Sequence, residues 1–438
     1  MKYLKAFVLL WSILLLVGCS RGDEKSPDGL RVPESPLLRY FESKSGRILY
    51  LGLDGNLRTV DEAGEEEIQL TLDGNLYESS PDFRGYTRFA WAPDSEKIAF
   101  VSIDHEKFTV NTIQADGTNP VQNYSGVDGS PIFLSWTPNG QIVSFLTNHW
   151  SPSGSEMAMH YFHTEGETAL HTLGRGEAYF WVWEPGGNSQ ILARVAREEQ
   201  SRVLIVSTDK AQETVLKVPP GTFQTPAWSP DGTQLLFSVQ ERESTQNQLV
   251  ITDLQGVIQT RLAQVGNSTA FGWSPDGKQI AYIASDRKWG GPVGPLTVQN
   301  LDNAGEKITV DDPFIHAFFW SPDSEKLAYF TLDVANGDLT SESTQGFSSL
   351  ITLYVLDTEN GERKNLLSFY PTVPFMDVLQ HFDQYQTSAS FWSPDSENMV
   401  VSAYAEGGES AVIVVVPASG NIQPRQIAEG LLAFWSSK

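Results

Sequence analysis

Trp228-Ser-Pro-Asp-Gly232 and Trp273-Ser-Pro-Asp-Gly277 are two copies of the five-residue motif that decides the fold of this chain. Related copies begin at further tryptophans, and a truncated one ends the chain: Trp91, Trp136, Trp183, Trp320, Trp392 and Trp435. From Trp91 onward, successive copies lie 45, 47, 45, 45, 47, 72 and 43 residues apart. A period of about 40 to 50 residues indicates a repeat architecture, in which each unit is one small supersecondary element. We therefore expect these eight tryptophans to have a structural role in the repeat.

Each repeat unit predicts four short strands. The Pro-Asp-Gly core favours a tight turn, because Pro fixes φ, Asp hydrogen-bonds its own backbone and Gly accepts a positive φ. Third strands such as residues 248–252 and 351–355 are apolar and rich in β-formers, and no long apolar period of 3.6 residues appears. Six units carry a bulky residue nine positions after the tryptophan, namely Phe100, Phe145, Phe237, Tyr282, Tyr329 and Val401. Four strands in a unit of about 45 residues are typical of a propeller blade.

The motif and the aromatic residue after it resemble the TolB-type propeller repeat, a relative of the WD repeat. This resemblance covers residues 40–438 and implies one all-β domain that works outside the cytoplasm. Counting tryptophans predicts eight blades, and the alternative is seven if the degenerate unit at Trp183 merges with a neighbour. The last residues, 435–438, placed before residues 45–50, make one ordinary repeat. The C-terminal strand is therefore expected to complete the N-terminal blade, which would leave no open edge.

The first 18 residues resemble a bacterial lipoprotein signal. Lys2 and Lys5 precede a mostly apolar run over residues 6–17, which is too short to span a bilayer core of about 30 Å. The run leads into Leu16-Val17-Gly18-Cys19, and in that family the signal is cut before the cysteine, whose thiol carries a diacylglycerol. The alternative is an ordinary signal peptide with a chance cysteine, but Cys19 is the only cysteine in the chain. We expect a lipid anchor at Cys19 on the extracytoplasmic side of a bacterial membrane, and a flexible tether over residues 19–39.

Composition excludes several classes of protein. Asp and Glu number 54 against 30 Lys and Arg, so a net charge of −24 argues against nucleic-acid binding, which needs clustered basic residues. A hydrophobic content of 40% is too high for a disordered chain. One cysteine allows neither an intramolecular disulfide nor a multi-cysteine metal site. The expected partners are the membrane, through the anchor, and an envelope protein or glycan; the chain itself is expected to be a monomer.

The candidate binding residues lie in long loops on the rim opposite the Pro-Asp-Gly turns. The 72-residue interval has 27 residues more than the usual 45, and they fall in segments 333–349 and 369–387. Long loops on a rigid scaffold commonly carry function. Segment 369–387 is aromatic, with a short helix expected over residues 376–384. It either forms a lid or binding ridge over the channel mouth, or packs its own apolar residues to cap the ring. The candidate rim residues are Trp150, Trp289, Tyr370, Phe375, His381, Phe382 and Tyr385.

Catalytic motifs are missing from the sequence. It contains no Gly-x-Ser-x-Gly elbow, no His-Glu-x-x-His pair and no glycine-rich phosphate loop, and no cofactor or metal is expected. His160 and His163 would point to opposite faces of a strand, which disfavours a shared metal. The sequence predicts a non-enzymatic scaffold that binds a protein or a glycan. The alternative is a propeller hydrolase, or a binder of a small molecule or metal, acting on a glycan, lactone or peptide.

Overall fold

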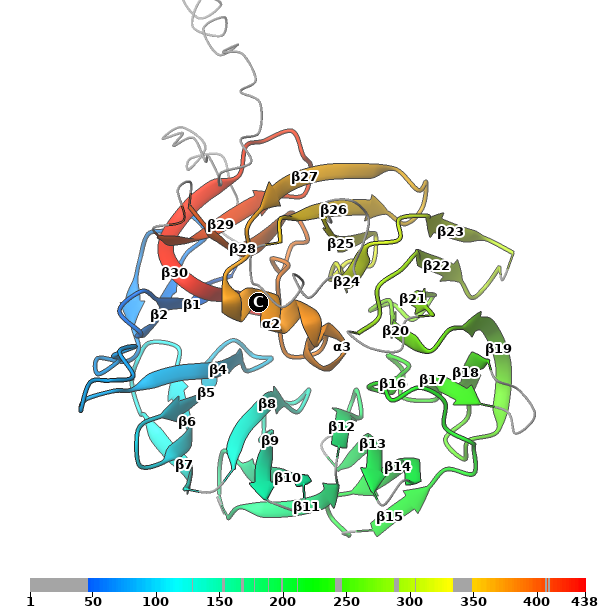
Figure 1. The fold of residues 1–438 in the computed structure, drawn as a ribbon, viewed down its shortest axis with the longest axis horizontal. Coiled ribbons are helices and arrows are strands. Elements are labelled where there is room, and N and C mark those ends of the chain that lie inside the picture. The colour runs from blue at the N-terminus through cyan, green and yellow to red at the C-terminus, as the bar shows by residue number, and fades with distance from the viewer. Residues whose placement is uncertain are drawn as a thin grey trace, which may run out of the picture.

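The computed structural model describes residues 46–438, with short gaps. The gaps are residues 128, 152–153, 167–168, 177, 188, 198–199, 211, 241–245, 287–290, 304, 334–348, 406–407 and 409, together with the side chains of residues 150–155 and 197. The signal, Cys19, the tether, Trp289 and most of segment 333–349 therefore lie outside the described residues. Short antiparallel sheets radiate around a common centre (Figure 1). The prediction of an all-β propeller is confirmed.

Six of the sheets have four strands, each built from consecutive strands of one repeat unit. The first three comprise β4 (Gly85–Trp91), β5 (Lys97–Ile103), β6 (Phe108–Gln114) and β7 (Val121–Gly126); β8 (Ser130–Trp136), β9 (Ile142–Ser151), β10 (Gly154–His163) and β11 (His171–Gly176); and β12 (Ala178–Trp183), β13 (Gln190–Arg197), β14 (Gln200–Ser207) and β15 (Gln212–Val215). The next three comprise β16 (Ala227–Trp228), β17 (Leu235–Gln240), β18 (Asn247–Thr252) and β19 (Ile258–Val265); β20 (Ser268–Trp273), β21 (Gln279–Ser285), β22 (Leu296–Asn300) and β23 (Lys307–Val310); and β24 (Ile315–Trp320), β25 (Lys326–Leu332), β26 (Ile351–Asp357) and β27 (Arg363–Phe369). In each unit the first strand is the one nearest the centre (Figure 1).

The seventh sheet joins the two ends of the chain. It has six strands in the order β28 (Asn398–Tyr404), β29 (Ala411–Pro417), β30 (Arg425–Trp435), β1 (Ile48–Gly52), β2 (Leu57–Val60) and β3 (Ile68–Gln69). The first half of β30 pairs with β29, from Arg425 to Glu429, and the second half pairs with β1, from Gly430 to Trp435. The expectation that the C-terminal strand joins the N-terminal segment is confirmed by this pairing.

The number of sheets differs from the eight blades expected from the tryptophans. Among the described residues the strands form seven sheets, which is the count of the alternative. The reason given for that alternative was wrong, however, because the unit at Trp183 forms a complete sheet of its own, β12 to β15. Two repeat units share the six-stranded sheet instead, because β30 runs without interruption from β29 to β1.

The Ser-Pro-Asp turns satisfy their own polar groups. Ser229 Oγ donates to Asp231 Oδ1 at 2.5 Å and accepts a hydrogen bond from the backbone N–H of Gln234 at 2.9 Å. The same pair of bonds recurs in three further units at Ser274, Ser321 and Ser393. The motif therefore folds locally, which explains why it recurs at the same place in each unit.

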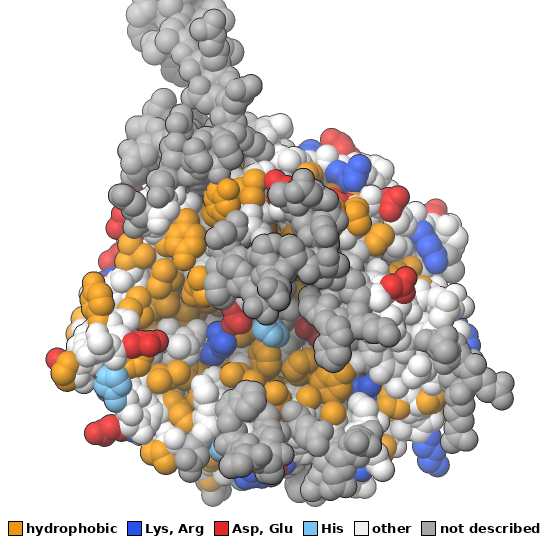
Figure 2. All heavy atoms as spheres, in the orientation of Figure 1, with side chains coloured by type: hydrophobic (Ala, Val, Ile, Leu, Met, Phe, Trp, Pro, Cys, Tyr) orange, Lys and Arg blue, Asp and Glu red, His pale blue; other side chains and the backbone are white. Residues whose placement is uncertain are grey.

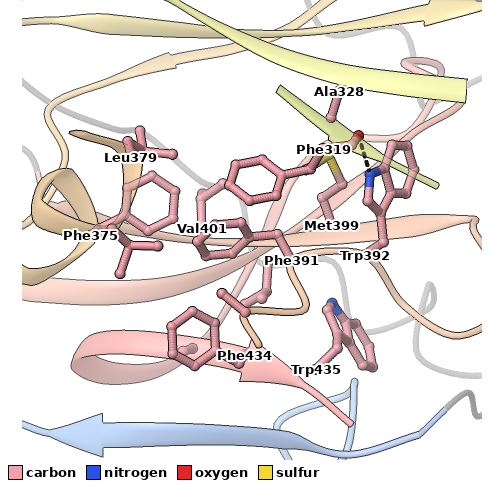
Figure 3. Packing of buried hydrophobic residues seen from close by; sticks show 14 of the residues in the cluster. Phe319, Ala328, Phe375, Leu379, Phe391, Trp392, Met399, Val401, Phe434 and Trp435 are labelled. Atoms are coloured by element: carbon pink, nitrogen blue, oxygen red, sulfur yellow. Dashed lines mark hydrogen bonds between the residues drawn. The ribbon is translucent and has the colours of Figure 1, made fainter. Parts of the chain in front are cut away.

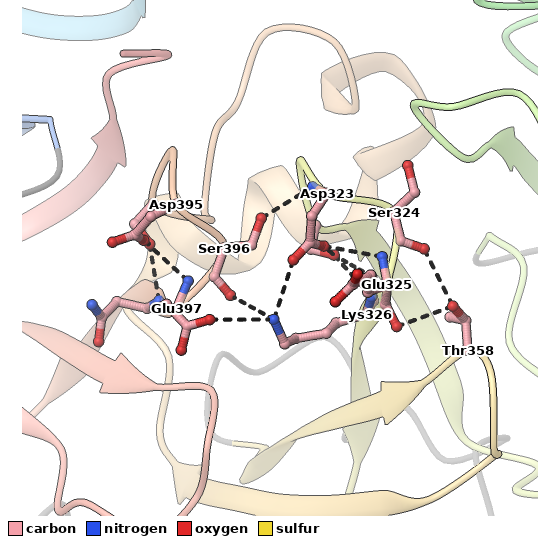
Figure 4. Close-up of polar contacts among 11 residues, drawn as sticks. Asp323, Ser324, Glu325, Lys326, Thr358, Asp395, Ser396 and Glu397 are labelled. Atoms are coloured by element: carbon pink, nitrogen blue, oxygen red, sulfur yellow. Dashed lines mark hydrogen bonds and ion pairs between the residues drawn. The ribbon is translucent and has the colours of Figure 1, made fainter.

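Serine replaces the last glycine of the motif in three units and connects neighbouring units. Ser95, Ser324 and Ser396 have φ values of +65°, +67° and +64°, in the left-handed region where glycine is favoured. Their hydroxyls accept hydrogen bonds from the backbone N–H groups of Lys438, Asp276 and Asp323 at 3.0, 3.0 and 3.1 Å. Figure 4 shows the contact between Asp323 and Ser396, beside the Lys326 ammonium that also reaches Glu397.

The repeated tryptophans connect the same units deeper in the ring. In four of them the indole Nε1 donates to the carbonyl of the residue just before the preceding unit's tryptophan. These bonds run from Trp91 to Phe434 (3.3 Å), from Trp136 to Ala90 (3.2 Å), from Trp228 to Val182 (3.3 Å) and from Trp392 to Phe319 (3.0 Å; Figure 3). Because Trp91 and Phe434 belong to opposite ends of the chain, one of these bonds crosses the closure of the ring.

Two short helices occupy the centre of the ring (Figure 1): α2 (Val373–Gln380) and α3 (Phe382–Tyr385). The sequence predicted a single helix over residues 376–384. The helical segment starts earlier because Thr372 caps it, accepting from the N–H of Phe375 at 3.4 Å and donating to the carbonyl of Leu431 at 2.5 Å. His381, with a φ of −116°, separates the two helices. No helix in the described part of the chain is long and apolar enough to cross a membrane.

Candidate functional site

The molecule has two faces of different construction. We call the face formed by the Trp-x-Pro-Asp turns the turn face. Both described chain ends lie on it, since the N–H of Arg47 donates to Ser436 Oγ at 2.8 Å. We call the opposite face, which carries α2, α3 and the loops that lead from one unit to the next, the plug face. Figures 1 and 2 view the molecule from the plug face.

The inner side of the two helices fills the centre of the ring with apolar side chains. Phe375, Val378, Leu379 and Phe382 are at most 1% exposed. This spacing of three and four residues forms one face of a helix. Phe375 lies 5.0 Å from the ring of Phe391 (Figure 3), and Phe382 lies 5.1 Å from that of Phe318. The segment thus packs its own apolar residues to cap the ring.

This packing corrects part of the candidate rim. Phe375, Phe382 and Tyr385 were candidates for a binding rim, but they are 0%, 1% and 6% exposed and belong to the core. Aromatic residues with helical spacing pack into the centre of the ring because that centre is itself apolar. The sequence alone did not show which side of the helix would face inward. Tyr370 is half-buried, and its carbonyl accepts from the N–H of Tyr404 at 2.8 Å. The backbone of Trp150 lies in β9, while its side chain is outside the described part.

The outer side of α2 carries polar groups. Asp377 and His381, one turn apart, have side chains that are 34% and 47% exposed. Asp377 Oδ2 lies 3.0 Å from Arg88 Nη2, and His381 Nδ1 lies 3.0 Å from the carbonyl oxygen of Asp377. The centre of the face in Figure 2 shows basic, acidic and histidine side chains together. A charged pair at the mouth of the ring can orient a polar ligand.

A β-bulge supplies Arg88. The pairing of β4 with β5 shifts between Tyr86 and Phe89, so that two residues, Thr87 and Arg88, oppose a single residue of β5. Bulges redirect side chains and are frequent near functional sites. Sequence analysis missed Arg88 because nothing in its local sequence marks a bulge. For Asp377, the spacing of four residues from His381 on the expected helix was the signal available.

Three half-buried phenylalanines continue from the helices across the plug face. We call Phe133, Phe180 and Phe223 the aromatic arc. The ring centroids of Phe133 and Phe180 are 5.9 Å apart, and those of Phe180 and Phe223 are 5.1 Å apart. Phe133 also contacts His381 at 6.0 Å and the buried ring of Tyr385 at 5.4 Å. Figure 2 shows hydrophobic side chains between the central polar groups and strands β8 and β12.

Phe133 has an unusual backbone. Its φ is +52°, and it is the extra residue of a second bulge, between Ile132 and Leu134 in β8. A bulky residue in the left-handed region costs about 1–3 kcal/mol, and such strain clusters at functional sites. The bulge turns the Phe133 ring toward α2 and α3 and so joins the aromatic arc to the plug.

A buried arginine closes the far end of the arc. Arg194 on β13 is 3% exposed, and its guanidinium carbon lies 5.4 Å from the centroid of Phe223. Its Nη2 donates to the carbonyl of Gly221 at 2.8 Å. Burial lowers the pKa of Arg194 to about 10. The contact fixes the ring of Phe223 by a cation–π interaction.

Polar bonds fix the helices on the ring. Asp383 Oδ2 accepts hydrogen bonds from Thr225 through both N–H (3.2 Å) and Oγ1 (3.1 Å). Burial raises the pKa of Asp383. Gln384 Nε2 donates to the carbonyl of Trp181 at 3.2 Å. These bonds attach α3 to the ring at Thr225 and at Trp181. Among the described residues, no group of three or more His, Cys, Asp or Glu could hold a metal ion.

Comparison with known proteins gives similarity of shape only. No protein-family model matches the chain, and no curated protein matches it. Similar solved structures include TolB from Acinetobacter baumannii, at 15% identity over 89% of this chain and 82% of that chain, with a TM-score of 0.38. An oligogalacturonate lyase from Vibrio parahaemolyticus is 11% identical over 86% and 91%, with a TM-score of 0.46. The β-propeller domain of the Trilobed protease from Pyrococcus furiosus is 12% identical over 78% and 98%, with a TM-score of 0.45. These values transfer neither activity nor ligand, and the fold assignment rests on the strand pairings themselves.

Proposed function

We propose that this chain is a membrane-anchored, extracytoplasmic propeller lipoprotein that binds a protein or glycan partner at its plug face and does not act as an enzyme. The observation that carries this proposal is Phe133 at positive φ, because it joins the half-buried aromatic arc to His381 at the end of α2. Half-buried rings still expose apolar surface. A partner that covers this surface would gain about 25 cal/mol of binding free energy per Å² of apolar area buried. The Arg88–Asp377 pair would orient the partner.

The anchor would leave the plug face free. The described chain starts at residue 46 on the turn face, where Arg47 lies beside Ser436. Residues 19–45 between the predicted lipid and this point can span at most about 90 Å. A tether of this length would keep the plug face accessible to a partner while the lipid stays in the membrane. This part of the proposal depends on processing at Cys19, which mass spectrometry of the membrane fraction tests directly: a mature N-terminus without acyl chains would exclude the anchor.

We also propose that the ring consists of eight repeat units. The two halves of β30 support this count. The first half pairs with β29 and is the outer strand of the unit that contains β28 and β29, whereas the second half pairs with β1 and is the inner strand of the unit that contains β1, β2 and β3. The sheet count stays at seven only because that strand is continuous. The proposal predicts that the two halves can be separated by a loop inserted between Glu429 and Gly430 without loss of the fold; a chain that no longer folds would contradict it.

The binding proposal is tested on the aromatic arc. Binding of the full chain to an array of purified envelope glycan fragments and to purified envelope proteins would be compared with that of Phe180→Ser/Phe223→Ser. The matched control is Val257→Ser, an apolar residue on the turn face that is 57% exposed. We expect a bound species whose affinity falls at least about tenfold in the double variant and is unchanged in the control. Equal binding by all three proteins, or metal-dependent cleavage of a glycan, would contradict the proposal.

A further inference from the structure

The loop between β3 and β4 holds apolar side chains out in solvent. Leu72 is 82% exposed and Tyr77 is 79% exposed, the largest values among the large hydrophobic residues in the described ranges. Leu76 in the same loop and Leu53 in the β1–β2 turn are 37% and 40% exposed. We call these four residues the apolar knob. Hydrophobic side chains protrude at the left edge of Figure 2, where β2 and β4 lie in Figure 1.

The backbone of this loop is fixed. Asn75 and Arg84 exchange two backbone hydrogen bonds at 2.9 and 3.0 Å across its base. The Arg84 guanidinium lies 3.1 Å from Asp73 and 3.2 Å from Asp104. The N–H of Gly74 donates to Asn56 Oδ1 at 2.8 Å. Leu72 and Tyr77 are thus exposed on an ordered loop. Binding a partner would therefore cost little conformational entropy in this loop.

Gly74 shows how closely the loop is set against the β1–β2 turn. A Cβ atom at this position would lie 2.4 Å from the carbonyl carbon of Gly55. Only glycine therefore permits this approach. The turn also lies against Leu76, since a Cβ atom on Gly55 would be 2.9 Å from Leu76 Cγ, so the loop with Leu72, Leu76 and Tyr77 adjoins the turn that carries Leu53.

The charges around the knob restrict what can cover it. Asp54 is paired with Arg58 at 2.6 Å, and Asp73 is paired with Arg84. Glu78 and Asp82 are exposed and have no ion pair within the described ranges. The knob is therefore bordered by uncompensated negative charge. A second copy of this acidic chain or an anionic lipid surface would meet like charge, which disfavours both.

We propose that the apolar knob is a preformed docking site for a protein partner that offers an apolar pocket bordered by lysine or arginine. Tyr77 would act as the central anchor, since tyrosine is enriched among the residues that dominate binding energy. Glu78 and Asp82 would pair with the basic border and set the orientation. The site uses none of the residues of the aromatic arc and does not depend on the function proposed for it.

Selection from a random peptide library tests this proposal. The full chain would be the target, and Leu72→Ser/Tyr77→Ser would be used for counter-selection. We expect peptides that combine apolar anchors with Lys or Arg, that bind the double variant at least about tenfold more weakly, and that bind less tightly at high salt. Recovered peptides that bind the double variant equally well, or that are acidic, would overturn it.

Control measurements distinguish a protein partner from a second copy of this chain and from a lipid surface. Val127→Ser removes an apolar side chain that is 75% exposed elsewhere on the plug face, and peptide binding should not change. Thermal melting should show the same midpoint for all three proteins, because the substituted side chains are exposed. Dimerisation in sedimentation, or binding to phosphatidylglycerol vesicles, that is lost in the double variant would assign the knob to self-association or to lipid and contradict the proposal.

Discussion

The turn face repeats one local structure, whereas the plug face departs from the repeat at several points. On the turn face the serine–aspartate bonds recur in four units, and serines at positive φ connect neighbouring units. On the plug side, the innermost strands β4, β8 and β24 each contain a bulge, at Arg88, Phe133 and His316. The comparison indicates that the same turn bonds recur around the ring, whereas Arg88 and Phe133 reach the candidate site from bulges in the innermost strands of two units.

Deleting residues 431–438 gives the largest expected effect. It removes the half of β30 that pairs with β1, the buried side chains of Phe434 and Trp435, and the acceptor of the Trp91 indole. The ring would open and expose the edge of β1, so we expect unfolding or aggregation in size-exclusion chromatography.

The matched control is deletion of residues 437–438 alone. This shorter deletion keeps the strand and removes two hydrogen bonds, from the N–H of Lys438 to Ser95 Oγ and from Ser436 Oγ to the carbonyl of Lys438. It should remain monomeric with a nearly unchanged melting temperature. A monomeric, equally heat-stable protein after the larger deletion would disprove the closure.

Phe375→Ala tests whether the plug belongs to the core of the ring. The side chain is fully buried between Phe330, Phe369 and Phe391, so its truncation should lower the free energy of unfolding by about 3–5 kcal/mol. Chemical denaturation measures this value. Val373→Ala, at a position 38% exposed on the same helix, should change it by less than about 0.5 kcal/mol. Equal, small effects would mean that the helices rest loosely on the ring.

Acid should weaken the plug side through His316. Burial lowers the pKa of His316 to about 4, so its imidazole stays neutral in the folded protein. In the unfolded chain the same imidazole takes up a proton below its ordinary pKa of about 6.5. Stability is complete above pH 6.5 and is lost as the pH falls toward 4, by about 1–2 kcal/mol between pH 6.5 and 5.

Denaturation at both pH values checks this effect. His316→Met should reduce the pH dependence, whereas His105→Gln, at an exposed histidine, should leave it as in the wild type. The same pH dependence in His316→Met and wild type would show that burial of this imidazole has no thermodynamic consequence. His160, whose pKa burial also lowers to about 4, should account for a further share.

Substitutions of Ser324 on the turn face should change the free energy of unfolding least. They separate the contribution of its hydrogen bond from the cost of its positive φ. Ser324→Ala removes the acceptor for the N–H of Asp276 and keeps the positive φ, so we expect a loss of about 1–2 kcal/mol. Ser324→Gly loses the same bond but relieves about 1 kcal/mol of backbone strain. The glycine variant should melt higher than the alanine variant. The reverse order would mean that strain at this position is negligible.

These cases also show which features the sequence could predict. The tryptophan period and the Ser-Pro-Asp turns predicted the propeller and its closure, because each unit repeats the same sequence pattern and the last copy is completed by the first residues of the ring. The sheet count was missed because the continuity of β30 depends on both chain ends. Phe133 and Arg88 were missed because a bulge is set by the pairing of two strands. Of the candidate rim residues, His381 is exposed whereas Phe375 and Phe382 are buried. The sequence left a binding ridge and an apolar cap open, because burial depends on what the helix packs against.

The most direct test of the central claim is a hydrogen-exchange footprint of the full chain with and without the species that it binds from the envelope array. The account predicts protection in residues 130–136, 178–183 and 373–385, which carry Phe133, Phe180 and His381, and no change in the turns after Trp228 and Trp273. Protection confined to those turns would place binding on the turn face and contradict the account.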